Sequence, residues 1–289
     1  MKLVVTADLH YDIDRSVEPT RRIAEEICGL RADALLVLGD IGGRDAGIVS
    51  DCLHLFDRFG GRKFFVAGNH DLWTEPGEDS LERFEHTLPG LCREAGFHPL
   101  DVEPATGNGI GLVGSIGWYD FSFRPARLGI PLRFYQAKIA PGAALQLGGY
   151  EQLIADRSDI PAAALEIGTR WMDGEHVRLP MSDVDFCRRV LDRFGQHLER
   201  AARDSEVIVV GLHHLPFRQL IPDNADPALT FVGAYMGSES FGELMLSEPK
   251  IRYAFCGHSH KPGRARCGHI ECITVGCTYA EKRYEMIEL

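Results

Sequence analysis

The sequence predicts an α/β fold built around a largely parallel β-sheet. Short apolar runs rich in valine, isoleucine, leucine and phenylalanine recur along the chain, and each is followed by a polar turn. Amphipathic helical patterns separate the first three of these runs. Runs of this length and composition are typical of strands that are buried on both faces. Their alternation with helices indicates parallel strands joined by right-handed crossovers.

Five apolar runs are expected to form the strands, namely residues 3–5, 34–38, 64–66, 207–210 and 253–256. Helices are expected at residues 21–30, 49–56 and 182–203, because apolar residues recur there at the spacing of one helix face. Ser182 stands at the N-cap of the third helix, and Asp185 occupies the capping-box position.

Length, composition and charge favour one globular domain over residues 1–289. The chain is 45% hydrophobic and 25% charged, which is ordinary for a globular protein of this length. Its 31 basic and 42 acidic residues leave a formal charge of −11, which argues weakly against a general binder of nucleic acids or membrane surfaces. No apolar stretch approaches the roughly 18 residues of a membrane span. The eight cysteines form no C-x-x-C pair and are expected to be reduced thiols of a cytoplasmic protein.

Residues 117–181 interrupt the pattern with five prolines and glycine-rich patches, and we interpret them as an inserted flap. Within the flap, residues 117–140 hold four basic residues against one aspartate, a local charge of +3, together with six aromatic residues. These aromatic side chains either cover a bound substrate or bury a small core of the insertion itself. We favour the second interpretation, because aromatic residues in loops mostly form such cores.

Each predicted strand is followed by side chains that can bind metal ions. In chain order they are Asp8 and His10; Asp40; Asn69, His70 and Asp71; His213 and His214; and His258 and His260. Because the carboxyl ends of parallel strands lie at one edge of a sheet, these residues are expected to converge there. Carboxylate, amide and imidazole ligands without thiolate suit manganese, iron, zinc or cobalt. Asp40 has two free oxygens and is the natural bridge between a pair of ions about 3.5–4 Å apart.

The motif order D-x-H, G-D, G-N-H-D, H and G-H-x-H resembles the calcineurin-like metallophosphoesterase superfamily. The resemblance implies a four-layer α/β/β/α sandwich of two mixed sheets and two divalent metal ions, with manganese the expected metal in vitro. It implies that one ion is held by Asp8, His10, Asp40 and His260, and the other by Asp40, Asn69, His213 and His258. It also makes His70 the group that meets the phosphate and protonates the leaving oxygen, while a metal-bound hydroxide attacks.

Two departures from the family pattern affect details of the site. The fourth motif reads His213-His214-Leu215-Pro216, so either histidine is a candidate ligand; we favour His213, the first after the strand, and expect His214 near the substrate. The second motif ends in Gly43-Arg44, where protein phosphatases carry an aspartate before the arginine. This difference disfavours a protein phosphatase and leaves Arg44 either a phosphate contact or a surface residue.

The expected activity is hydrolysis of a small phosphomonoester or phosphodiester, with Asn69, Arg44 and His214 as candidate substrate contacts. One alternative is a nuclease of the same superfamily, which the charge of −11 opposes because duplex binding needs a basic track. A second alternative is a non-catalytic scaffold. The presence of His70 and of residues at every ligand position disfavours it. No membrane partner is expected.

Overall fold

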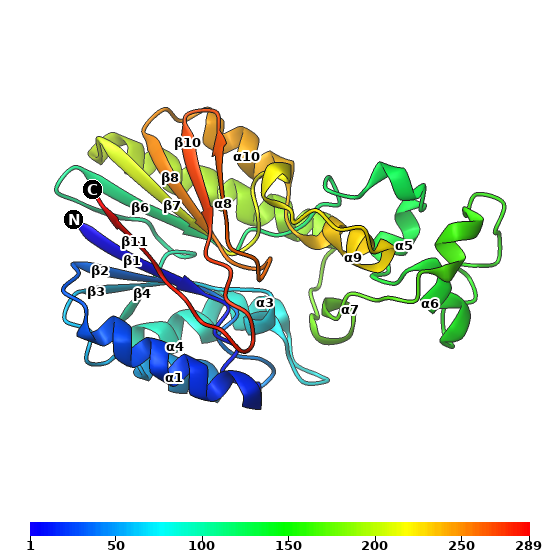
Figure 1. The fold of residues 1–289 in the computed structure, drawn as a ribbon, viewed down its shortest axis with the longest axis horizontal. Helices are drawn as coiled ribbons and strands as arrows, with labels where there is room; N and C mark the ends of the chain where they lie inside the picture. The colour runs from blue at the N-terminus through cyan, green and yellow to red at the C-terminus, as the bar shows by residue number, and fades with distance from the viewer.

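Two β-sheets face one another in the computed structural model, which describes residues 1–289 (Figure 1). The first sheet has the strand order β11-β1-β2-β3-β4. Its strands are β1 (Lys2–Ala7), β2 (Ala34–Leu38), β3 (Arg62–Val66), β4 (Phe97–Pro99) and β11 (Glu285–Glu288). Strands β1 to β4 run parallel, and β11 pairs antiparallel with β1.

The second sheet has the order β5-β6-β7-β8-β10-β9. Its strands are β5 (Ala105–Gly107), β6 (Ile110–Ser115), β7 (Val207–Leu212), β8 (Ile251–Cys256), β9 (Gly263–Cys267) and β10 (Ile270–Thr274). The four central strands are parallel, while β5 and β9 are antiparallel edges. All five strands predicted from the apolar runs are present. The other six strands were not predicted from the sequence.

Helices cover the outer faces of both sheets, which gives the predicted four-layer α/β/β/α sandwich (Figure 1). The first sheet carries α1 (Asp14–Gly29) and α4 (Leu88–Glu94), with α2 (Ala46–His54) packed against α4. The second carries α8 (Asp183–Asp204) and α10 (Glu239–Leu246). Between the sheets lies a buried apolar layer that includes Leu36, Val66, Val209 and Phe255. None of the helices combines the length and the apolar character needed to cross a membrane.

The helix predicted at residues 182–203 is α8, and its predicted cap is confirmed. The Ser182 Oγ accepts a hydrogen bond from the Asp185 backbone N–H at 3.1 Å and donates one to its carboxylate at 2.7 Å. Such a cap stabilises a helix by about 1 kcal/mol. The opposite side of the helix is buried through Phe186, Val190 and Phe194, which seats α8 on the second sheet.

The expectation that all five motifs share one sheet edge is wrong. Strands β1, β2 and β3 belong to the first sheet, whereas β7 and β8 belong to the second. An apolar run shows that a strand is buried, but it does not show which of two facing sheets the strand joins. The carboxyl ends still meet, because the His213 ring after β7 donates from Nδ1 to the Leu38 carbonyl at the end of β2 (2.9 Å). The site therefore lies between the ends of two sheets.

The segment 117–181 contributes no strand to either sheet and extends away from the sandwich (Figure 1, green). It contains η3 (Ala126–Leu128), α5 (Leu132–Gln136), α6 (Pro141–Gln146), η4 (Ala162–Glu166) and α7 (Asp173–His176). The six aromatic side chains of residues 117–140 are at most 2% exposed, and they are buried in the large apolar cluster that also holds Phe186 and Val190 of α8. The expectation that they form a core of the insertion itself is therefore wrong. Their basic neighbours are engaged within the protein, since Arg133 pairs with Asp159 and Lys138 with Asp183.

The remaining elements are short. They are η1 (His70–Leu72), α3 (Ser80–Glu82), η2 (Arg83–Thr87), η5 (Arg218–Leu220), α9 (Pro227–Val232) and η6 (Gly233–Tyr235). Two of them matter for the site. The first, η1, directly follows the third motif, and α9 with η6 packs between the second sheet and the insertion (Figure 1).

Candidate metal centre

Strained backbone marks the candidate ligands. Eight non-glycine residues have positive φ, and five of them are predicted metal ligands with φ between 45° and 67°. These five are Asp8, His10, Asp40, His258 and His260. The left-handed backbone conformation is about 1–2 kcal/mol less favourable for a non-glycine residue, and residues with such strain are common at functional sites. Each strained residue follows the end of a strand, where the chain turns its side chain into the space between the sheets.

The glycines of two motifs are required by the close approach of their loops. Gly39 has φ +67°, and a Cβ there would lie 2.3 Å from the Gly68 backbone nitrogen. A Cβ on Gly68 would in turn lie 2.2 Å from the Asp40 Oδ1. A side chain at position 39 would displace the Gly68 backbone, and one at position 68 would displace the carboxylate of Asp40. The G-D and G-N-H-D patterns are therefore a packing requirement of the site.

Asp71 ties these two loops together. Its buried carboxylate accepts hydrogen bonds at 2.8–3.0 Å from the backbone N–H groups of Asp40, Ile41, Gly42 and Gly68. Burial and the nearby Asp40 raise the pKa of Asp71 to about 6, against the lowering effect of these backbone donors. Asp71 thus holds the ligand-bearing loops in place by their backbone, and its hydrogen bonds go to backbone N–H groups instead of a ligand imidazole.

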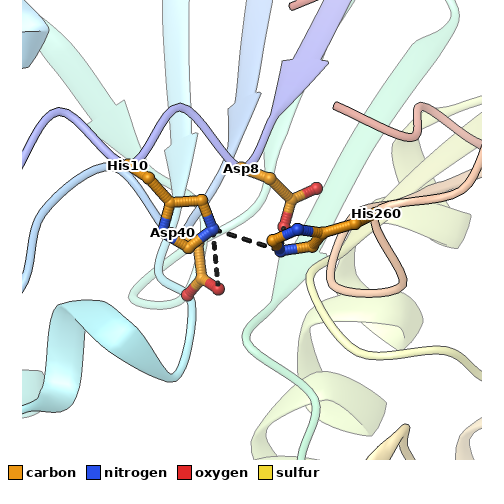
Figure 2. Close-up of side chains that lie close together, drawn as sticks. All are labelled: Asp8, His10, Asp40 and His260. Carbon is orange, nitrogen blue, oxygen red and sulfur yellow. Dashed lines mark hydrogen bonds and ion pairs between the residues drawn. The ribbon is translucent and has the colours of Figure 1, made fainter. Parts of the chain in front are cut away.

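Asp8, His10, Asp40 and His260 form the first ligand group (Figure 2). Their ligand atoms all lie within 4.8 Å of one another. The His10 Nε2 lies 3.1 Å from the His260 Nε2 and 3.8 Å from the Asp40 Oδ2. The His260 Nε2 lies 3.8 Å from the Asp8 Oδ1. The side chains point toward one common space, as a shared cation requires.

Asp40, His213 and His258 form the second group, and Asn69 adjoins it. The His213 Nε2 lies 3.3 Å from the Asp40 Oδ1, 3.1 Å from the His258 Nδ1 and 3.2 Å from the Asn69 Oδ1. Asp40 is the residue that the two groups share, and its oxygens face different groups. A carboxylate placed in this way could hold a cation on each side.

The structure separates the two histidines of the fourth motif. His213 uses Nδ1 as donor to the Leu38 carbonyl, which leaves Nε2 free to face the ligand group. His214 donates from Nδ1 to the Ile116 carbonyl (2.8 Å), and its buried Nε2 has no partner. Burial lowers the pKa of His214 to about 3, so its ring is neutral. His214 packs behind the His258 ring at 4.2 Å and belongs to neither group.

The electrostatics of the site suit divalent cations. Burial opposes a charge on His213, yet the Asp40 and Asp8 carboxylates raise its pKa to about 9. Burial likewise opposes the charge on Asp40, but the neighbouring histidines hold its pKa well below the usual range. The Asp8 Oδ2 and the His10 Nδ1 are buried without hydrogen-bond partners. The carboxylate oxygens and imidazole nitrogens that converge in the two groups suit borderline divalent ions.

His70 lies beside both groups and outside them. Its backbone N–H donates to the Asp40 Oδ1 at 2.9 Å, and its ring stacks on the Trp73 indole with centroids 3.7 Å apart. A cavity of about 380 Å³ opens in front of this ring and reaches Asp40, Asn69, His70, His258 and His260. Arg44, the other predicted phosphate contact, does not line the cavity; it is half exposed and pairs with Glu75 at 3.5 Å.

One residue of the site, Asp173, was not anticipated from the sequence. Its carboxylate is buried and accepts four hydrogen bonds. Its Oδ1 accepts hydrogen bonds from the Asn69 Nδ2 (2.9 Å) and the Trp73 Nε1 (2.8 Å). Its Oδ2 accepts hydrogen bonds from the Tyr119 hydroxyl (3.0 Å) and the Trp171 Nε1 (2.7 Å). Because the Asn69 amide donates to Asp173, its oxygen is turned toward the second ligand group. Asp173 is thus a positioning residue that reaches the centre from the insertion.

Replacing Asp173 with alanine is expected to weaken binding of one of the two ions by about 10- to 100-fold, since partners that orient a metal ligand contribute effects of this size. Titration of the metal-free protein with Mn²⁺, followed by calorimetry, measures this directly. Tyr119→Phe is the matched control, because it removes one hydrogen bond to the same carboxylate but spares the bond to Asn69. Two ions bound to Asp173→Ala with wild-type affinity would contradict the positioning role.

The comparisons with known proteins agree with the fold and the motifs. The family model described as calcineurin-like phosphoesterase matches residues 1–136, which carry the first three motifs. Over these residues the match confirms the resemblance that the motif order predicted, and the fourth and fifth motifs lie outside it. A comparison with curated proteins finds no significant match.

Solved structures show the same fold over nearly the whole chain. The phosphopantetheinyl hydrolase of Mycobacterium tuberculosis is 18% identical, with a TM-score of 0.70 over 96% of this chain and 90% of that one. A dimetal phosphatase from Danio rerio is 14% identical, with a TM-score of 0.51 over 95% and 86% of the two chains. At such identities the likeness establishes the fold, and the activity has to be argued from the site.

Proposed function

We propose that this chain is a metal-dependent phosphoesterase that hydrolyses a small phosphomonoester or phosphodiester. The observation that carries the proposal is the pair of ligand groups that share Asp40 at the floor of a cavity. Two divalent ions held there would activate a water molecule and polarise the phosphoryl oxygens. The family match and the dinuclear arrangement of ligands both support a hydrolase.

The residues around the ligands supply the remaining parts of the mechanism. His70 borders the cavity, and its ring is held by stacking on Trp73, so it is the group placed to contact the phosphate and to give a proton to the leaving oxygen. Asp71 and Asp173 fix the loops and the Asn69 amide in advance, so that little rearrangement is needed when substrate binds.

The substrate we propose is a small molecule, not a nucleic acid. A cavity of about 380 Å³ lies within the range of small-molecule sites. Two of the four basic residues of segment 117–140, Arg133 and Lys138, pair with carboxylates of the protein, so the segment offers no continuous basic track. The seven buried cysteine thiols suit the cytoplasmic location expected from the sequence. The structural likeness to a phosphopantetheinyl hydrolase makes phosphopantetheinyl esters one substrate class to test.

Removal of metal tests the proposal. Protein treated with a chelator is expected to lose activity on p-nitrophenyl phosphate or bis-p-nitrophenyl phosphate and to regain it with Mn²⁺. A preparation of Asp40→Asn, purified in parallel, controls for contaminating phosphatases. Metal binding without turnover of either ester, with manganese, iron, zinc or cobalt, would favour a scaffold. Cleavage of duplex DNA without cleavage of small esters would favour a nuclease.

A further inference from the structure

We propose that the cavity beside the metal centre selects phosphoesters whose alcohol portion is apolar, such as a branched aliphatic or aromatic group, over esters of polyols and sugars. The inference rests on the proposed phosphoesterase function and specifies its substrate class. The wall of the cavity that carries no candidate metal ligand supports this selectivity.

Two tryptophans form the rigid part of this wall. Trp73 stacks on His70, and Trp171 lies parallel to the Tyr235 ring at 5.3 Å with an interplanar angle of 2°. Both indole N–H groups donate to the buried carboxylate of Asp173. Because their only polar groups are already bonded, the two indoles present apolar surface to a ligand. Trp73 and Trp171 are held in place before any substrate arrives.

The second part of the wall comes from α9 and the turn that follows it. Leu229, Val232 and Met236 line the cavity there, and Met172 from the insertion joins them. The Leu229 side chain is 52% exposed, more than any other large hydrophobic residue in the chain, and no other strongly exposed one lines the cavity. Removing such surface from water is favourable in proportion to its area, so a ligand with a complementary apolar group gains affinity there.

Polar recognition groups are scarce on the same wall. Arg170 is the one lysine or arginine that lines the cavity, and its guanidinium pairs with Glu175 at 2.9 Å. The Asp173 carboxylate is saturated by its four donors. A sugar or polyol would therefore lose its hydrogen bonds to water on entering and regain few of them, and a second phosphate would meet a single guanidinium, which is half exposed and shared with Glu175.

A pair of esters with similar leaving groups tests this selectivity. Isopentyl phosphate and glycerol 3-phosphate are both alkyl phosphomonoesters, and glycerol is the slightly more acidic alcohol, so the chemistry itself does not favour the apolar ester. The manganese-loaded protein is expected to show a kcat/KM at least about 10-fold higher for isopentyl phosphate, the scale of one or two buried methylene groups. Equal values, or a preference for the glycerol ester, would overturn the inference.

Leu229→Gln locates the effect within the cavity. It is expected to lower kcat/KM for isopentyl phosphate about 5-fold or more and to lower that for glycerol 3-phosphate by clearly less. Leu132→Gln is the control, because Leu132 is also an exposed leucine but lies outside the cavity. An equal loss on both esters, or the same effect from both variants, would contradict the role assigned to this wall.

Binding of unreactive analogues separates this inference from the proposed function. Isopentyl phosphonate is expected to bind the manganese-loaded protein at least about 10-fold more tightly than 2,3-dihydroxypropyl phosphonate, by calorimetry. This preference without hydrolysis of any ester would refute the phosphoesterase function and support the selectivity of the cavity. Hydrolysis of esters with no binding preference would support the function and refute the selectivity.

Discussion

Replacing Asp40 with asparagine is expected to reduce the bound metal from two ions per chain to one or none and to lower kcat/KM by about 1,000-fold or more. Asp40 is the residue common to both ligand groups, with one oxygen facing each. An asparagine offers one oxygen and one N–H₂, and the N–H₂ group cannot bind a cation. Loss of charge stabilisation worth about 4 kcal/mol in the transition state corresponds to a rate change of this size.

Metal analysis of the purified variant and its kinetics at saturating Mn²⁺ measure the two effects of Asp40→Asn. Asp45→Asn is the control: it removes one nearby negative charge from the N-cap of α2, and asparagine caps helices as well as aspartate does. A melting curve of the metal-free variant shows that it is folded. Two ions retained per chain with undiminished affinity would refute the bridging role of Asp40.

Replacing His70 with glutamine is expected to leave metal binding intact and to lower kcat by about 100- to 10,000-fold on an alkyl phosphate, the range typical of general acid catalysis. His70 borders the cavity but belongs to neither ligand group, so the chemical step is affected and the metal content is not. An ester whose alcohol leaves readily without a proton, such as p-nitrophenyl phosphate, is expected to lose much less.

The comparison of the two esters is the decisive measurement for His70. His176→Gln is the matched control, because the His176 ring lies 4.5 Å from Trp73 within the same aromatic stack but does not line the cavity. Equal losses of kcat on both esters would show that His70 does not protonate the leaving group, and loss of metal would show that it supports the ligands instead.

Strands and ligands that depend on local patterns could be predicted from the sequence. Continuous apolar runs identified β1, β2, β3, β7 and β8, and the polar residues directly after them form both ligand groups. The physical reason is that residues directly after a strand lie at the end of that strand. Once the strands are identified, the places of Asp8 and Asp40 follow from the sequence.

Strand β6 shows why other elements could not be predicted. It is interrupted by Gly111 and Gly114, which break the apolar run. A Cβ on Gly114 would lie 2.5 Å from the Leu100 Cβ. A glycine is therefore needed here to let the strand pack closely against Leu100. Such a requirement arises from the packing of segments that are distant in the sequence, so the apolar pattern of residues 110–115 did not predict a strand.

The parts of the site supplied by the insertion depend on contacts between distant residues. Asp173 and Asn69 are separated by 104 positions, and nothing in the Trp171-Met172-Asp173 sequence marks a buried carboxylate. The sequence drew attention to the aromatic and basic residues of 117–140, which do not line the cavity. Residues 170–173 and α9 form that wall instead, while the aromatic residues of 117–140 are buried in the large apolar cluster beneath it.

The four hydrogen bonds to Asp173 have a consequence for how such proteins diversify. An insertion that determines substrate choice is usually regarded as a module that can be exchanged while the catalytic core is kept. Here the same carboxylate orients Asn69 in the core and anchors both tryptophans of the cavity wall. An exchanged insertion would have to bring its own acceptor for the Asn69 amide. We therefore expect that substitution of single wall residues such as Leu229 can change the substrate preference of this fold. Exchange of the whole insertion is expected to damage the metal centre.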